Sequence, residues 1–128
     1  MNIVLWVLQI GLGVFFLFTG IQHFIVPPGL PAPMAWMYDL PAGLHYVSGT
    51  AEILIALGLI LPGLTRIQTR LTPLAAAGLV AVMLGASAWH FPRAEYQNIL
   101  MNLVIAAVAA FLAYARWRLV PLKDKASA

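Results

Sequence analysis

The stretch GTAEILIALGLIL, residues 49–61, decides how the chain is interpreted, because its one charged residue, Glu52, stands in a run that is otherwise small or apolar. Together with the residues before it, this stretch predicts a membrane-spanning helix over residues 44–61. An acidic residue at the centre of such a helix costs about 2.5–3.5 kcal/mol of insertion free energy. A partner, a bound proton or a water-filled cavity must offset this cost, and each of these indicates a functional site.

The composition is that of an integral membrane protein. The 128 residues are 62% hydrophobic and 9% charged, whereas soluble domains carry about 25% charged residues. The basic residues flank apolar runs and do not alternate with aromatic residues on a polar face, so the net charge of +3 predicts contact with a lipid bilayer and no nucleic-acid partner. The chain has no cysteine, which excludes thiolate catalysis, disulfide exchange and iron–sulfur clusters.

Four apolar runs are long enough to cross a bilayer, and they predict an all-α, antiparallel four-transmembrane-helix bundle in a single domain over residues 1–120. The runs cover residues 3–25, 44–61, 71–91 and 96–114. We expect the first run to be a retained helix and not a cleaved signal peptide. Pro27-Pro28 should end the first helix, and Pro62-Gly63 the second.

The segments between and after the helices are less regular. Residues 26–43 form the longest connection, and Pro33 to Leu40 predicts a short interfacial helix with Trp36 and Tyr38 at headgroup level. The tail, residues 121–128, is polar and is expected to be mobile.

The basic residues predict the orientation of the helices. Only Arg93 lies between the third and fourth runs, and the other six lie on the side of both termini. By the positive-inside rule, both termini are then cytoplasmic, and we expect a bacterial inner (plasma) membrane as the location. The six are Arg66, Arg70, Arg116, Arg118, Lys123 and Lys125.

In this orientation, the polar residues of the predicted helices gather in the outer half of the membrane. His45, Ser48 and Glu52 are spaced i, i+3, i+7 and share one helix face. We therefore predict an outward-facing polar pocket with Glu52 at its floor. Thr19 and Ser87 lie at the same depth, and the predicted ligand-binding residues are Gln22, His45, Ser48, His90, Asn98 and Asn102.

Each of these residues also has a purely structural interpretation. The two asparagines can join helices by hydrogen bonds, and the histidines can be ordinary interfacial residues. Glycines such as Gly20, Gly49 and Gly58 can allow close helix packing, within one chain or in a homodimer. Glu52 itself can be a buried ion pair or a protonated acid that holds the bundle together.

Four kinds of chemistry suit the predicted pocket. Glu52 and His23 can transfer protons to a quinone, which is the cofactor such a relay would serve. Alternatively, the pocket grips a lipid or the membrane helix of a partner, or it exports small cations around Glu52. A metal site is the weakest option, because no two histidines have i, i+4 spacing; its ligands would be His23, His45, Glu52 and His90.

The helix sequences resemble the DoxX-like family of small four-helix membrane proteins over nearly the whole chain. The resemblance is carried by GVFFLFTGIQHF (13–24), Gly49-x-x-Glu52, TPLAAAGLVAVMLGASAWH (72–90) and NILMNLVIAAVAAF (98–111). Family members commonly have lysine at the position of His23, so the resemblance implies a titratable His23–Glu52 pair in place of a lysine pair. Members serve as subunits in thiosulfate:quinone oxidoreduction and redox-stress complexes, and in receptor assembly or cargo export.

The leading functional hypothesis is a membrane subunit or assembly-type protein that binds a small hydrophobic ligand such as quinone or lipid and is not an enzyme on its own. The alternative is a quinone-linked oxidoreductase subunit with proton transfer by Glu52 and His23. A small proton-coupled exporter is the third hypothesis. A homodimer or a partner membrane protein fits the glycine-rich faces.

Overall fold

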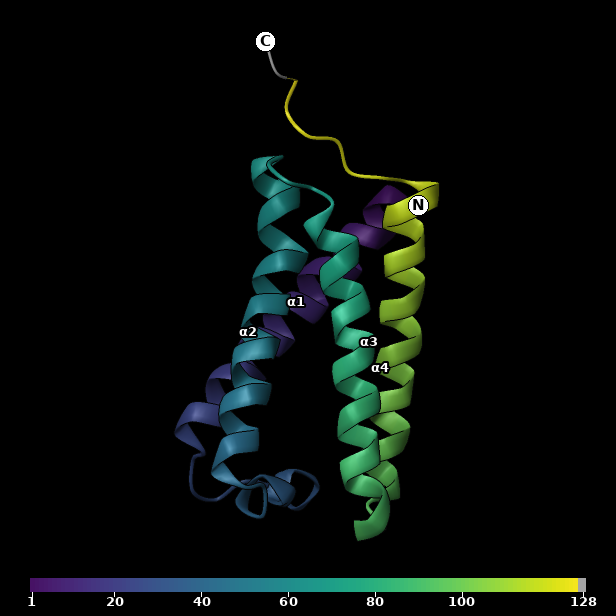
Figure 1. Ribbon diagram of the computed structural model, residues 1–128. Coiled ribbons are helices and arrows are strands. Elements are labelled where there is room, and N and C mark those ends of the chain that lie inside the picture. The colour runs from purple at the N-terminus through teal and green to yellow at the C-terminus, as the bar shows by residue number, and fades with distance from the viewer. Residues whose placement is uncertain (127–128) are drawn as a thin grey trace.

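The computed structural model describes residues 1–126, and over those residues it is built from helices alone (Figure 1). Four helices are long and apolar enough to cross a membrane, which confirms the predicted all-α class and the four spans. They are α1 (Asn2–Ile25), α2 (Ala42–Thr65), α3 (Leu71–His90) and α4 (Tyr96–Tyr114). Two 3-10 helices, η1 (Ala32–Tyr38) and η2 (Phe91–Arg93), and a π-helical turn, η3 (Ala115–Leu119), complete the structure.

The helices form two closely packed pairs. Helix α1 packs along α2, and α3 packs along α4, while α2 and α3 make most of the contact between the pairs. The N-terminus, the segment after α4 and the connection at residues 66–70 lie at one end of the bundle, at the top of Figure 1. We call this the terminal end. The opposite end carries η1 and η2, and we call it the Trp36 end.

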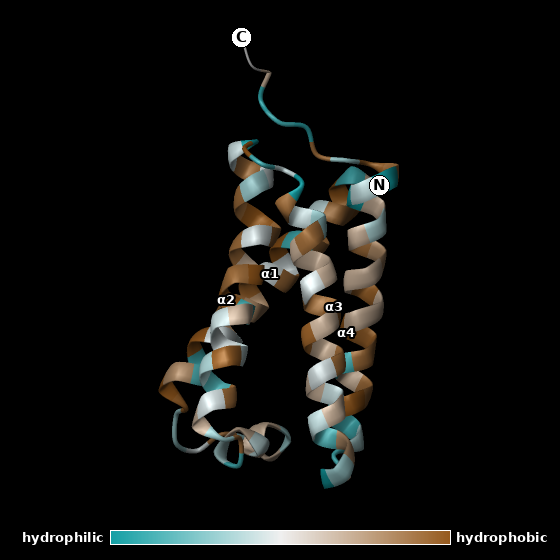
Figure 2. Ribbon diagram, viewed as in Figure 1, coloured by the Kyte–Doolittle hydropathy of each residue, from teal (hydrophilic) through white to brown (hydrophobic). Residues whose placement is uncertain are grey.

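Apolar side chains point both into the bundle and out of it. Leu5, Leu59, Leu79 and Leu112 are fully buried between the helices. Other large apolar side chains, such as Phe18, face outward, and apolar residues dominate the middle of each helix in Figure 2. This is the pattern of helices that pack on one face and contact lipid on the other.

Glycines bring α1 and α2 into backbone contact. A Cβ atom built on Gly49 would lie 2.9 Å from the carbonyl oxygen of Gly20, and one built on Gly20 would lie 3.1 Å from that of Gly49. The space beside Gly13 is similarly filled by the side chain of Ile60, and the space beside Gly63 by that of Trp6. These glycines therefore serve helix packing within the chain, as the structural interpretation of the sequence proposed.

The expectation that Pro62-Gly63 ends the second helix is wrong. Helix α2 continues to Thr65, with Pro62 inside it. Proline cannot donate a hydrogen bond, so the carbonyl of Gly58, four residues earlier, loses its helical partner. The hydroxyl of Thr72, on α3, donates to this carbonyl at 2.8 Å. Helix α3 thus supplies the hydrogen-bond donor that Pro62 lacks, and α2 continues past the proline.

The polar tail is held in place over most of its described part, contrary to the expected mobility. The Thr69 hydroxyl donates to the Leu122 carbonyl at 3.1 Å, and the Lys125 amide donates to the Arg66 carbonyl at 2.8 Å. The tail is therefore fastened to the connection between α2 and α3. Residues 127–128, the end of the predicted mobile segment, lie outside the described residues.

Candidate functional site

Glu52 lies buried where α1 and α2 cross, with 5% of its surface exposed. The hydroxyl of Thr19 donates to its Oε1 atom at 2.6 Å, and the Nε2 atom of His23 lies 2.8 Å from its Oε2 atom. Both partners come from α1, one turn apart on the same face. The close approach of Gly20 and Gly49 brings this face of α1 within reach of Glu52.

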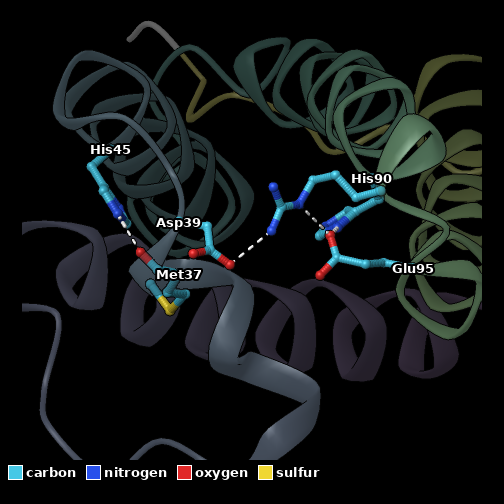
Figure 3. A network of polar contacts seen from close by, with 6 residues as sticks. Met37, Asp39, His45, His90 and Glu95 are labelled. Atoms are coloured by element: carbon cyan, nitrogen blue, oxygen red, sulfur yellow. Dashed lines mark hydrogen bonds and ion pairs between the residues drawn. The ribbon is translucent and has the colours of Figure 1, made fainter.

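The contacts continue from Glu52 toward the Trp36 end. The Nδ1 atoms of His23 and His45 are 2.9 Å apart, and the Nε2 atom of His45 lies 2.8 Å from the carbonyl oxygen of Met37 in η1. Figure 3 shows His45 directed at this carbonyl. Glu52, His23, His45 and the Met37 carbonyl therefore form one continuous chain of polar contacts, which we call the Glu52 chain.

The number of protons in the Glu52 chain follows from its geometry. Each of its three contacts needs one proton between the two atoms that it joins. The Met37 carbonyl can only accept, so His45 must carry a proton on Nε2, and its Nδ1 atom, when neutral, accepts from His23. Two neutral imidazoles supply only two protons. The third contact requires an extra proton, which Glu52, His23 or His45 can carry.

With the extra proton, the Glu52 chain has no net charge. It is either a carboxylic acid beside two neutral imidazoles or a carboxylate paired with an imidazolium. Without the proton, it carries one negative charge and loses one hydrogen bond, and both changes are unfavourable for buried groups within a membrane. The geometry therefore favours a Glu52 chain that holds one proton more than a carboxylate and two neutral imidazoles carry together.

A second polar cluster covers the Trp36 end. The Nδ1 atom of His90 lies 3.0 Å from the Oε1 atom of Glu95, to which the Nε atom of Arg93 also donates at 2.9 Å. Arg93 reaches across to Asp39 at 2.7 Å and so joins the segment after η1 to the segment after α3 (Figure 3).

Trp36 lies between the two clusters. Its ring centroid is 6.0 Å from that of His23, 5.1 Å from that of His90 and 6.1 Å from that of Trp89. The indole thus separates the Glu52 chain from His90. Trp36 is half-buried between the helix pairs, and its place at headgroup level stays a prediction.

The charge of Glu95 depends on its partners. Partial burial by itself raises the pKa of the Glu95 carboxyl, but hydrogen bonds from His90 and Arg93 and the charge of Arg93 outweigh it and hold the pKa below the ordinary 4.5. A carboxylate with a lowered pKa stabilises the fold above its unfolded pKa, and this contribution is lost as the pH falls through the folded value.

We therefore expect Glu95→Gln to lower the free energy of unfolding by about 0.5–1 kcal/mol at neutral pH and to have a much smaller effect at an acidic pH below the lowered pKa of Glu95. Thermal unfolding of both proteins in detergent at the two pH values measures this difference. A Glu95→Gln effect of the same size at both pH values would contradict the lowered pKa of the Glu95 carboxyl.

The structure brings some of the predicted site residues together and leaves others apart. His23, His45 and Glu52 meet, whereas His90 pairs with Glu95. Within residues 1–126, the remaining predicted residues make no side-chain hydrogen bond: Gln22, Ser48 and Asn98 are half-buried, and Asn102 is buried. The outward-facing pocket remains a prediction, and a hollow of about 690 Å³ lies at the opposite, terminal end.

Two buried polar atoms on α1 and α3 lack hydrogen-bond partners. The Oγ atom of Ser87, on α3, and the Oε1 atom of Gln22, on α1, are buried with no hydrogen-bond partner in the protein. Such atoms cost about 1–3 kcal/mol each unless a ligand or water satisfies them. Within residues 1–126, no group of three or more His, Cys, Asp or Glu side chains is arranged to hold a metal ion.

Three contributors to the site were not predicted as site residues. Thr19 is one, although its position four residues before His23 places it on the same helix face. The Met37 carbonyl and the Trp36 ring come from η1, whose path depends on how the loop folds back over the bundle. Only the spacing of Thr19 gave a signal in the sequence.

The comparison with protein families agrees with this architecture. The family model described as the DoxX-like family matches residues 7–112, which include all four long helices in whole or in large part. The chain belongs to the DoxX-like family. The family and the four apolar helices together make it an integral membrane protein. Neither the curated proteins nor the solved structures include one that matches the chain.

The place of this DoxX-like chain in its family confirms the resemblance seen in the helix sequences. The residue three positions after Gly20 is His23, and it contacts Glu52 directly.

Proposed function

We propose that this DoxX-like protein is a membrane subunit or assembly-type protein that binds a small hydrophobic molecule, such as quinone or lipid, between its helix pairs near the Trp36 end. The observation that carries the proposal is the pair of buried, unpartnered polar atoms, Ser87 Oγ and Gln22 Oε1, one from each helix pair. A ligand with a hydroxyl or carbonyl group and an apolar body would satisfy these atoms and remain compatible with the surrounding lipid.

The proposed orientation is an antiparallel bundle with both termini in the cytoplasm of a bacterium and the Trp36 end on the outer side of the inner membrane. The excess of basic residues at the terminal end supports it. In this orientation the ligand enters from the outer leaflet, and a partner membrane protein or a second copy of the chain receives it.

The ligand is tested by native mass spectrometry of protein extracted in a mild detergent. We expect a small hydrophobic molecule to be retained by the wild-type protein and to be depleted about tenfold in Ser87→Ala, because the hydroxyl that it would engage is gone. Thr65→Ala is the matched control, because this hydroxyl donates within its own helix at the terminal end. A protein that is consistently free of ligand, or equal depletion in both variants, would refute the proposal.

A second candidate function is proton transfer in a quinone-linked oxidoreductase complex. The Glu52 chain favours it, because the contacts that hold its extra proton run from Glu52 through His23 and His45 to the η1 loop. General acid–base groups contribute about 10²–10⁴-fold to such reactions. Quinone-dependent turnover in a Glu52→Gln variant tests this candidate.

A further inference from the structure

The hollow of about 690 Å³ at the terminal end is a second candidate binding site, independent of the function proposed for the Trp36 end. It lies between the connection of α2 to α3 and the segment after α4. Its basic lining residues are Arg70, Arg116, Arg118 and Lys123, and its one acidic lining residue is Asp124. Four cations facing one carboxylate favour an anionic ligand.

The carboxylate of Asp124 is already engaged. The Thr69 amide and hydroxyl donate to its Oδ1 atom at 2.8 and 2.7 Å. These hydrogen bonds, from the backbone first and then from the side chain, lower the pKa of Asp124. Asp124 therefore serves to fasten the tail to Thr69, and this attachment forms one wall of the hollow.

Arg116 is a buried cation that lacks a counter-charge. Only 2% of it is exposed, although its position near the end of the last helix would suit an exposed arginine. Its Nε atom donates to Gln9 at 2.6 Å, and one terminal nitrogen donates to Asn2 at 2.7 Å and to the Val120 carbonyl at 3.0 Å. All of these acceptors are neutral.

The other terminal nitrogen of Arg116 is buried without a hydrogen-bond partner in the protein, and the nearest aromatic ring is that of Trp6, 5.8 Å from the guanidinium carbon. Within residues 1–126, no ion pair involves Arg116. A buried guanidinium in this state is costly unless an anion lies close to it. Because Arg116 lines the hollow, an anion bound there would supply the missing charge.

We propose that this hollow binds a phosphate group, and that its source is the headgroup of an anionic lipid. Arginine forks match the geometry of phosphate oxygens, and basic pockets at the cytoplasmic ends of membrane helices suit lipid headgroups. Trp117, Pro121 and Leu122 also line the hollow. The Trp117 ring is half-exposed, and its centroid lies 5.5 Å from the guanidinium carbon of Arg70. These residues offer apolar surface to the part of a lipid below its phosphate.

The test uses the full chain in detergent, with native mass spectrometry as the readout. Phosphatidylglycerol is compared with diacylglycerol of the same acyl chains, which lacks the phosphate. We expect one phosphatidylglycerol to be retained in preference to diacylglycerol. The double variant Arg70→Gln/Arg118→Gln should weaken this binding roughly tenfold or more, because it removes two of the cations that would face the phosphate. Arg116 is left intact because it also joins α1 to η3.

The matched control is Arg66→Gln/Lys125→Gln, which removes the same charge from the same end and leaves the lining residues unchanged. Among the described residues, the only hydrogen bond to a lining residue that the control alters is the long, exposed one from the Arg66 side chain to the Lys123 carbonyl, at 3.4 Å. It should retain phosphatidylglycerol as the wild-type protein does, and thermal unfolding should show both double variants folded. Equal weakening in the two double variants, or equal retention of the two lipids, would overturn the proposal.

Inorganic phosphate distinguishes the two sources of the anion. If millimolar phosphate leaves phosphatidylglycerol in place, the lipid headgroup is the ligand, as proposed. If phosphate binds through Arg70 and Arg118 and displaces the lipid, the site takes the free anion, and the lipid source is wrong.

Discussion

Gly49→Ala is expected to lower the free energy of unfolding by about 2 kcal/mol, because α1 and α2 have no room for a methyl group where they cross. The new Cβ atom would lie 2.6 Å from Phe24 Cε2, 2.9 Å from the Gly20 carbonyl oxygen and 2.9 Å from His23 Cβ. The Phe24 ring can turn aside. The carbonyl belongs to the backbone of α1, so the two helices must move apart, and this movement also strains the contact between His23 and Glu52.

Gly85→Ala is the matched control for this substitution. Gly85 also lies inside a long helix, but a Cβ atom there meets nothing within 4 Å. Alanine favours a helix over glycine by up to about 1 kcal/mol, so Gly85→Ala should be neutral or slightly stabilising. Unfolding of both variants in mixed micelles measures the difference. Equal stability of Gly49→Ala and Gly85→Ala would show that the crossing is looser than described.

Glu52→Leu is expected to cost about 3 kcal/mol of stability, whereas Glu52→Gln should stay within about 1 kcal/mol of the wild-type protein. Leucine leaves the Thr19 hydroxyl and the Nε2 atom of His23 without their partner. Glutamine can donate its amide proton to that nitrogen and accept from Thr19. All contacts of the Glu52 chain are then made with two neutral imidazoles and no extra proton.

The two substitutions at Glu52 separate stability from proton transfer. Glutamine should keep the fold but lacks the acidic proton. If the protein acts in a quinone-linked complex, as the second candidate function proposes, quinone-dependent turnover should fall at least about 10²-fold in Glu52→Gln. Unfolding and turnover are measured on the same preparations, with Gly85→Ala as the control for both. Full turnover in a folded Glu52→Gln protein would eliminate the proton-transfer candidate. A Glu52→Leu protein as stable as the wild type would contradict the described contacts.

The helices were predictable from the sequence because each span carries its own signal, an apolar run of sufficient length. The meeting of Glu52 with His23 and His45 was also predictable in outline, because helical spacing placed polar faces at one depth. The end of α2 was not predictable from local sequence. Whether Pro62 ends a helix depends on Thr72, which lies in the next helix and reaches the Gly58 carbonyl only after the two have packed.

Arg116 shows why the rest of the site required the structure. In the sequence it resembles the other basic residues that follow the last span, and the positive-inside rule places all of them in water. Its burial depends on Gln9 and Asn2, which are more than 100 residues away in the chain. It also depends on the π-helical turn at residues 115–119, for which composition gives no signal.

The hydrogen bond from Thr72 to the Gly58 carbonyl has a consequence for biosynthesis. A span that contains Pro62 and enters lipid alone would expose an unsatisfied carbonyl to hydrocarbon, which is unfavourable. Only the short segment 66–70 separates this span from the one that carries Thr72. The second and third spans are therefore best released from the translocon together, as a hairpin whose two halves complete each other before they meet the rest of the chain.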